Sequence, residues 1–110
     1  MSDPDSQAIA GRFASKWDWE KALLERSIAE GLTPTAQHVA LALSTYADGD
    51  GTSIRPTAAR VVRVTGRSRA TVFQALKELR NRGWVTQVSK GAGATRRASE
   101  YRLSIPPKVQ

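Results

Sequence analysis

The sequence predicts an α+β domain that is mainly helical and ends in a β-hairpin. Four apolar-periodic segments between residues 15 and 82 carry the start and stop signals of helices. After Gly83 the hydrophobic period changes from 3.6 to 2 residues, as expected for strands. With 110 residues, the chain is long enough for one such core.

The N-terminal part combines a polar leader with one helix. Residues 1–13 are small, polar and without periodicity, so we expect a disordered leader. Ser15 can cap a helix within residues 14–31, which Gly31 would stop. The apolar residues with heptad-like spacing in this helix are Trp17, Leu24 and Ile28. Because Trp19 points to a different side from Trp17, one tryptophan is expected outside the core, where it could face a partner subunit.

The second helix has a cap and a strong amphipathic pattern. Thr33 caps it, Pro34 is its first residue, and the pattern continues to about Tyr46. Its apolar face consists of Leu32, Ala36, Val39, Ala40, Leu43 and Ala47. The following turn, residues 48–51, lacks the later glutamate of a calcium loop, so no metal site is expected there. Residues 52–54 are predicted to form a short strand.

Two further helices have the arrangement of a helix-turn-helix. Pro56 opens a short helix, and Ser68 caps a longer one that Gly83 closes. The turn between them contains Gly66, and two short helices joined by such a turn are the signature of this motif. The residues expected on the buried sides are Ala58, Ala59, Val61 and Val62 in the first helix, and Val72, Ala75, Leu76 and Leu79 in the second.

The C-terminal part predicts a hairpin with a basic tip. Residues 84–89 and 101–105 alternate between apolar and polar side chains, and residues 90–98 between them are rich in glycine and arginine. Phe73 is expected to pack against this hairpin. Helices followed by a basic-tipped hairpin form a winged helix-turn-helix, which we place at residues 32–106, with the 14–31 helix as an addition.

Charge separates sharply along the chain. Residues 1–50 carry four basic and eight acidic side chains, a net charge of −4, whereas residues 51–110 carry 13 basic and two acidic ones, a net charge of +11. Such segregation favours a polyanion bound to the second half, although a solubilising basic surface is the alternative. Arginine outnumbers lysine there, and its planar guanidinium suits phosphate and guanine.

Several classes of chemistry find no support. The chain has no cysteine and one histidine, His38, which excludes disulfides, iron–sulfur clusters, zinc fingers and cysteine nucleophiles. There is no phosphate-binding glycine motif and no pair of carboxylates with an obvious base. We therefore expect no enzyme, no catalytic residues, no metal and no cofactor. Without a long apolar run or a signal peptide, a cytoplasmic, nucleoid-associated protein is expected.

The ordered motifs resemble a known family over roughly residues 32–105. The stretches that carry the resemblance are Leu32–Thr35, Asp48–Gly51, Arg55–Thr57, Thr65–Val72, Gly83–Val85 and Tyr101–Leu103. Together they resemble the winged helix-turn-helix family of phage and plasmid replication-associated proteins and small actinobacterial DNA-binding proteins. The order also looks like the winged domains of MarR- and GntR-type regulators. Residues 60–64 depart from that pattern, because they are more basic and more β-branched.

The predicted fold defines three groups of candidate DNA-binding residues. The N-terminal part of a recognition helix enters the major groove, the wing can reach the minor groove, and the preceding helix meets the backbone. The recognition-helix candidates are Arg67, Ser68, Arg69, Ala70, Thr71, Gln74 and Lys77. The wing candidates are Lys90, Thr95, Arg96 and Arg97. The backbone candidates are Arg55, Thr57, Arg60 and Arg63.

The function that these residues indicate is sequence-specific binding of double-stranded DNA by a small transcriptional regulator, acting as a repressor. A replication-initiation or partition accessory protein at an origin is one alternative, and an adaptor that binds protein through the winged fold is another. A homodimer is expected through the 14–31 helix, although this helix can equally pack in cis as a fourth helix. No small-molecule substrate or effector is indicated.

Overall fold

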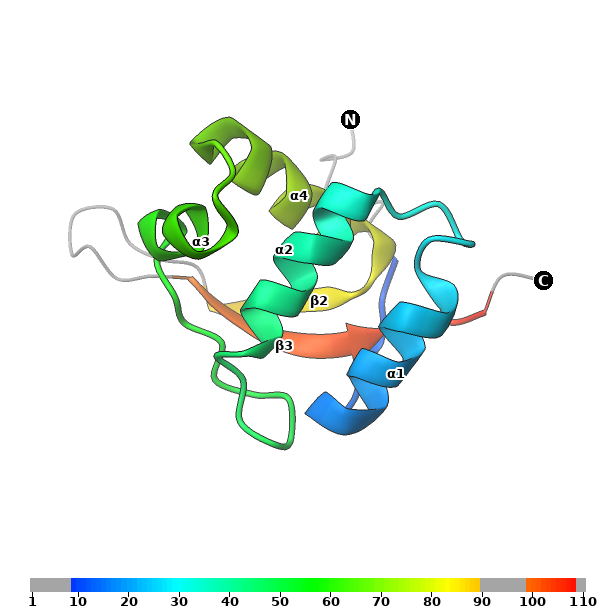
Figure 1. Cartoon of the computed structure of the whole chain (residues 1–110). Helices are drawn as coiled ribbons and strands as arrows, with labels where there is room; N and C mark the ends of the chain where they lie inside the picture. Colours follow the sequence, from blue (N-terminus) through cyan, green and yellow to red (C-terminus); the bar gives the residue numbers. More distant parts are fainter. Residues whose placement is uncertain (1–8, 90–98, 109–110) are drawn as a thin grey trace, which may run out of the picture.

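The computed structural model describes residues 9–89 and 99–108, which have the predicted α+β architecture. The elements are β1 (Arg12–Phe13), α1 (Lys16–Arg26), α2 (Pro34–Ser44), α3 (Ala58–Thr65), α4 (Arg69–Arg82), β2 (Val85–Ser89) and β3 (Glu100–Ile105). The strands form an antiparallel sheet in the order β1-β3-β2. Figure 1 shows α2 between α1 on one side and α3 and α4 on the other. This arrangement agrees with a winged helix-turn-helix that carries an extra N-terminal helix.

Each of these helices begins with a side-chain cap. The capping hydroxyls, which accept a hydrogen bond from the backbone N–H three residues ahead, belong to Ser15, Thr33, Thr57 and Ser68. Three of these caps, at Ser15, Thr33 and Ser68, agree with the sequence prediction. The predicted start of α3 at Pro56 is too early, because the hydroxyl of Thr57 caps the helix and fixes its first turn at Ala58.

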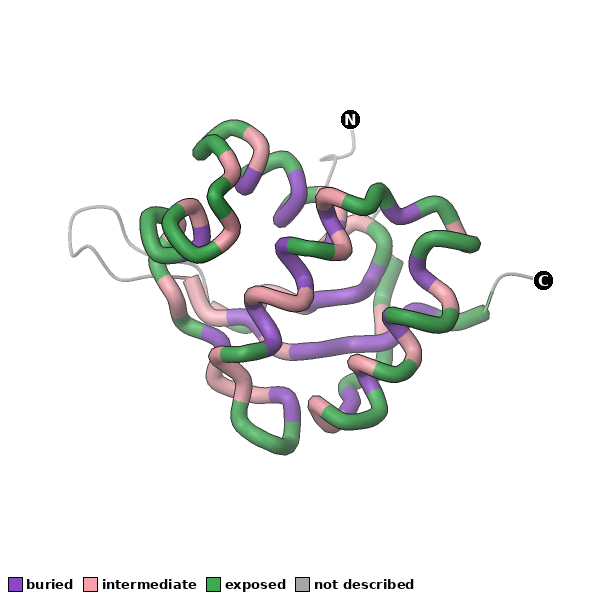
Figure 2. The backbone as a smooth tube through the Cα atoms, in the orientation of Figure 1, coloured by how far each residue is buried: buried purple, intermediate pink, exposed green. Residues whose placement is uncertain are grey.

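The core lies between the helices and one face of the sheet (Figure 2). Its largest side chains are Trp19 and Trp84, and the indole Nε1–H of Trp19 donates to the carbonyl oxygen of Trp84 at 2.8 Å. This bond satisfies a buried donor while α1 packs on β3 and α2. The predicted buried residues that the structure confirms in α2 and α4 are Ala36, Val39, Ala40, Leu43, Val72, Ala75, Leu76 and Leu79.

The apolar face predicted for the N-terminal helix is wrong. The three residues with heptad-like spacing are exposed, namely Trp17, Leu24 and Ile28. The buried residues are instead spaced by four, namely Trp19, Leu23 and Ser27. The helix is also shorter than predicted, because α1 ends at Arg26 and Gly31 adopts its positive φ of 99° in the turn that follows. The tryptophan prediction holds, since one of the pair is buried and the other is not.

The leader prediction fails for residues 9–13. Arg12 and Phe13 pair with Ile105 and Ser104 of β3, and the N–H of Ile9 donates to the carbonyl of Asn81 at 2.8 Å. A two-residue strand carries too little alternation to be recognised in a sequence. Residues 1–8 lie outside the described part of the chain.

The short helix α3 buries less than predicted. Val61 is buried, Ala58 and Val62 are half-buried, and Ala59 is exposed. Ile54, in the predicted strand, forms an isolated bridge with Tyr101 of β3. Helix α3 therefore presents most of its surface to solvent while it packs against α2 and α4.

Candidate nucleic-acid interface

The turn between α3 and α4 is built by local hydrogen bonds. Gly66 ends α3 in the left-handed conformation at φ 71°, and the N–H of Arg67 donates to the Thr65 hydroxyl at 3.3 Å. The Ser68 hydroxyl then accepts the N–H of Thr71 at 3.1 Å and donates to its hydroxyl at 2.9 Å. The first turn of α4 is thus fixed by two bonds between Ser68 and Thr71, so both hydroxyls serve the helix start.

Helix α4 has two well-separated faces, as the sequence predicted. Val72, Ala75, Leu76 and Leu79 point into the core. On the opposite side, Ala70, Gln74 and Lys77 are exposed. Small, amide and basic side chains with this exposure have the chemistry that reads base edges or meets phosphates in a major groove. Their role as DNA contacts stays a prediction.

Arg67, in the turn between α3 and α4, is held by a residue of α2. Its Nε–H donates to Nδ1 of His38 on α2 at 3.2 Å. His38 therefore acts as an acceptor that restrains the guanidinium beside the start of α4. Because five N–H donors share the guanidinium, this bond leaves the remaining donors of Arg67 available.

A hollow of about 390 Å³ lies at the start of α3 and brings most of the backbone candidates together. Its lining consists of Tyr46, Ser53, Arg55, Pro56, Thr57 and Arg60. Arg63 lies on the exposed surface of α3 outside this lining. Arg55 also forms an ion pair with Glu100 of β3, from Nε to Oε1 at 2.9 Å, so part of its charge is neutralised.

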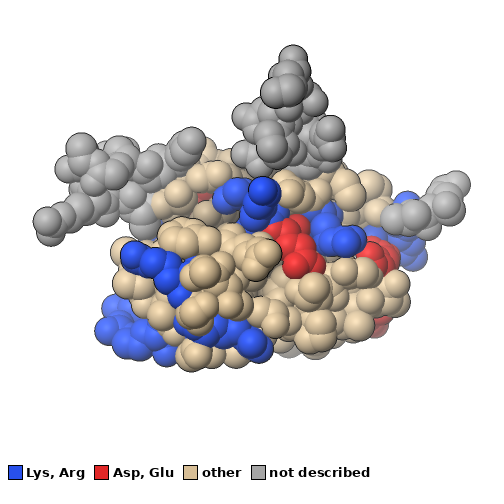
Figure 3. Space-filling view, turned by 90° about the horizontal axis from the view of Figure 1, so that it is seen from above, with Lys and Arg blue, Asp and Glu red and all other residues tan. Residues whose placement is uncertain are grey.

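The surface around the helix-turn-helix is strongly basic. Residues 51–77 contain six basic side chains and no acidic one. Apart from Arg55, none of these cations has a carboxylate within ion-pair distance among residues 9–89 and 99–108. In Figure 3, basic side chains gather at the end of the molecule that carries α3 in Figure 1. A polyanion would therefore be attracted to this surface.

The four wing candidates lie on the segment between β2 and β3. Lys90, Thr95, Arg96 and Arg97 lie outside the described residues, between Ser89 at the end of β2 and Ser99 before β3. The stem from which they arise is in place, because β2 and β3 pair in an antiparallel register. Their contact with a minor groove stays a prediction.

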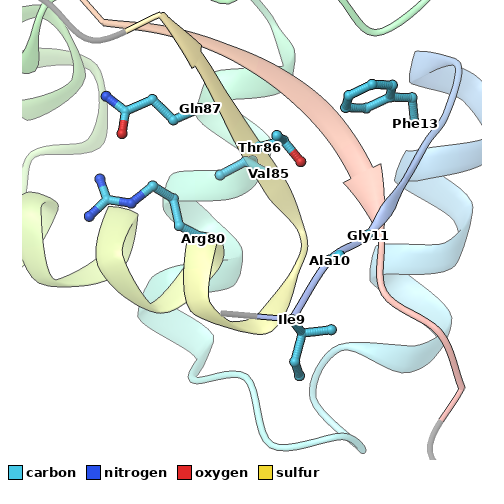
Figure 4. Close-up of a pocket in the computed structure, with 8 residues that line it drawn as sticks. All are labelled: Ile9, Ala10, Gly11, Phe13, Arg80, Val85, Thr86 and Gln87. Atoms are coloured by element: carbon cyan, nitrogen blue, oxygen red, sulfur yellow. The ribbon is translucent and has the colours of Figure 1, made fainter. Parts of the chain in front are cut away.

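A second hollow of about 390 Å³ lies between residues 9–13, the last turns of α4 and β2 (Figure 4). Its lining consists of Ile9, Ala10, Gly11, Phe13, Arg80, Val85, Thr86 and Gln87. Arg80 is the charged residue of this lining, and no predicted DNA-binding residue belongs to it.

Three residues of the interface carry no recognisable signal in the sequence, namely His38, Tyr46 and Ser53. The contact of His38 joins residues 29 positions apart, which no local pattern reveals. Ser53 has a positive φ of 69°, unusual for a residue with a side chain, and nothing in its neighbours predicts this.

Comparison with known families supports the helix-turn-helix. The family model of the IclR helix-turn-helix domain matches residues 51–89, about a third of the chain. The matched segment contains α3, the glycine turn, α4 and β2. The match supports a DNA-binding, regulator-like role. It also points to a regulator rather than an enzyme, and it supports the helix-turn-helix resemblance broadly without testing the phage and plasmid family.

Searches among curated proteins and among solved structures gave no match. None of the helices in the described ranges has both the length and the apolar character to cross a membrane. The same ranges contain no cluster of three or more histidine, cysteine or acidic side chains that could hold a metal ion.

Proposed function

We propose that this chain is a sequence-specific double-stranded DNA-binding protein that regulates transcription as a repressor. Helix α4 would lie in the major groove, with Arg67, Arg69, Ala70 and Gln74 toward the base edges. Repression needs no cofactor in this scheme, because occupancy of a promoter is sufficient.

The observation that carries the proposal is the exposed face of α4. Its first turn is fixed by the Ser68 cap, its apolar side is anchored in the core, and its outer side presents Ala70, Gln74 and Lys77. No acidic side chain occurs between Asp50 and Glu78 to repel phosphates. The family match over residues 51–89 also supports a DNA-binding role for this segment.

The hollow at the start of α3 supports a role in holding the DNA backbone. Arg55, Thr57 and Arg60 surround it, and the N–H groups of the first α3 turn add a partial positive charge. A phosphate there would fix the register of α4 without reading sequence. Arg63 would add a contact one turn further along α3.

The exposed side of α1 supports a homodimer. Trp17 is 82% exposed, Leu24 two turns further along α1 is exposed as well, and Ile28 in the turn after the helix adds a third exposed apolar side chain. Three large apolar side chains at this spacing form a stripe of the kind that pairs with a second helix. Because Figure 1 places α1 at the opposite end from α3, pairing through this stripe would leave both DNA-binding surfaces free.

Selection from random duplex DNA at near-physiological salt tests the proposal. An enriched motif is expected, and its symmetry reports a monomer or a dimer. Near-physiological salt matters because a basic protein at low ionic strength binds any DNA through counterion release. Binding without enrichment would favour an architectural or origin-associated role, and absence of binding would favour the protein adaptor.

Matched variants distinguish sequence-specific contacts to bases from non-specific electrostatic binding to the DNA backbone. Arg67→Gln and Arg69→Gln should each weaken binding to the selected site by about 1–3 kcal/mol. Arg60→Gln should weaken binding to all sequences alike and reduce the salt slope by about 1. Arg12→Gln is the control, since it removes an exposed charge of β1, outside the helix-turn-helix. Equal effects of all four variants would contradict the proposed site.

Sedimentation equilibrium tests the dimer. Trp17→Ala and Leu24→Asp are expected to shift the protein toward monomer, whereas Val88→Ala removes an exposed apolar side chain of β2 and should not. A wild-type protein that remains monomeric at tens of micromolar would refute the homodimer.

A further inference from the structure

Phe73 is an exposed aromatic residue in the middle of the proposed recognition helix. It is 51% exposed, whereas the other large apolar side chains of α4, Val72, Leu76 and Leu79, are buried. The expected packing of Phe73 against the hairpin does not bury it within the described residues. Its position on the helix lies between the core side and the outer side that carries Ala70 and Lys77.

Phe73 supports the guanidinium of Arg69. The two residues are one turn apart, and Cζ of Arg69 lies over the ring at 5.8 Å from its centroid. Arg69 has no carboxylate partner in the part of the chain that the structure describes. A guanidinium over an aromatic ring uses none of its N–H donors in that contact, while the ring limits the directions in which it can point.

We propose that Arg69 and Phe73 together read a thymine–guanine step. Arg69 donates to O6 and N7 of the guanine, and the ring of Phe73 packs on the 5-methyl group of the neighbouring thymine. The assignment rests on the proposed DNA-binding function and names two adjacent bases of its site.

The positive charge around Phe73 favours DNA, rather than a second copy of this chain, as the partner that covers the ring. The ring lies beside Arg69, and Lys77 follows one turn further along α4. The nearest acidic residue along α4 is Glu78, which accepts hydrogen bonds from Thr33, the N-cap of α2. A second copy of this basic surface would be repelled, whereas a polyanion is attracted. The thymine methyl is the apolar group that the major groove offers to an aromatic side chain.

The test replaces thymine by uracil, which removes the methyl group alone. Uracil is placed at each thymine of the selected site in turn, and Kd is measured by fluorescence anisotropy at fixed salt. Burial of one methyl group corresponds to about 0.8 kcal/mol, so one position per half-site should show about a fourfold higher Kd for the wild-type protein. Phe73→Ala should remove this sensitivity without changing the salt slope, and Phe73→Leu should keep part of it.

A second base analogue tests the arginine. Replacement of the adjacent guanine by 7-deazaguanine removes the N7 acceptor, so it should weaken wild-type binding severalfold. Arg69→Gln should lose most of that sensitivity while it keeps the response to uracil. Val88→Ala is the control, because it removes an exposed apolar side chain from the sheet.

Three results would overturn the inference. The first is a selected site with no position sensitive to uracil, and the second is an unchanged uracil response in Phe73→Ala. The third is a Phe73→Ala protein whose urea midpoint falls and whose binding weakens equally on all DNA, because this would mark Phe73 as a packing residue. In each case an enriched site leaves the proposed function intact, whereas failure to enrich any site overturns both.

Discussion

Two adjacent leucines of α1 have opposite environments and test which side of this helix faces the core. Leu23 is 0% exposed and Leu24 is 61% exposed. Leu23→Ala removes three carbon atoms, which corresponds to about 2.4 kcal/mol of transfer free energy at about 0.8 kcal/mol each. The cavity left behind raises the expected loss in the free energy of unfolding to about 3–5 kcal/mol. Leu24→Ala removes the same atoms from a largely solvated site, so about 1 kcal/mol is the upper limit.

Urea denaturation at several protein concentrations measures both losses. The loss for Leu23→Ala is expected at every concentration, because its contacts lie within one chain. The effect of Leu24→Ala should shrink on dilution, since any large part of it would come from the proposed dimer. Equal losses for the two variants in the dilute range would refute the assignment and would place the heptad-spaced residues in the core.

Three smaller predictions concern polar contacts. Glu78→Ala removes a carboxylate that accepts two bonds at the start of α2, at 2.8 and 3.0 Å, and should lower the free energy of unfolding by about 1–2 kcal/mol in the same urea assay. Hydrogen bonds from the side chain and backbone of Thr52 lower the pKa of Asp50. These bonds stabilise the folded protein at pH values above the pKa of Asp50 in the unfolded chain, and the stabilisation is lost as the pH falls through the pKa of Asp50 in the folded protein. Asp50→Asn should therefore flatten the pH dependence of the urea midpoint below about pH 4. His38→Ala releases the Nε of Arg67, and a change in Kd for the selected DNA site with an unchanged urea midpoint would show that this contact positions the guanidinium.

The helix starts were predictable because their physics is local. A hydroxyl that accepts the N–H three residues ahead is visible as a sequence pattern, and Ser15, Thr33 and Ser68 all act in this way. The glycine turn at Gly66 is local as well, since a left-handed residue at a helix end favours glycine. The position of the helix-turn-helix followed from these signals alone.

The orientation of α1 was not predictable, because its sequence contains two competing apolar registers. Trp17 and Leu24 form one register, while Trp19 and Leu23 form the other, which continues into the polar Ser27. The interaction that favours the second register is the bond from the Trp19 indole to a carbonyl 65 residues away. A bond over that separation leaves no periodic trace in the sequence.

Part of the candidate site was hidden for the same reason. Arg55 was correctly placed near α3, but its ion pair with Glu100 spans 45 residues and reduces its share of free charge. Phe73 was expected to be covered by the hairpin, and the amphipathic pattern of α4 alone could not decide this, because the residue lies at the edge of the buried side. Local pattern thus identified the elements of the site, whereas contacts between elements set the state of individual side chains.

The arrangement of the two exposed surfaces links the dimer to the DNA it would bind. Helix α1, whose exposed apolar side chains carry the proposed dimer contact, and helix α3, which belongs to the basic surface, lie on opposite sides of α2 (Figure 1). Recognition helices of a symmetric dimer must enter successive major grooves about 34 Å apart. The proposed dimer therefore predicts a site with two inverted half-sites about one helical turn apart, and an enriched motif with a single unrepeated half would contradict the role of α1 in pairing.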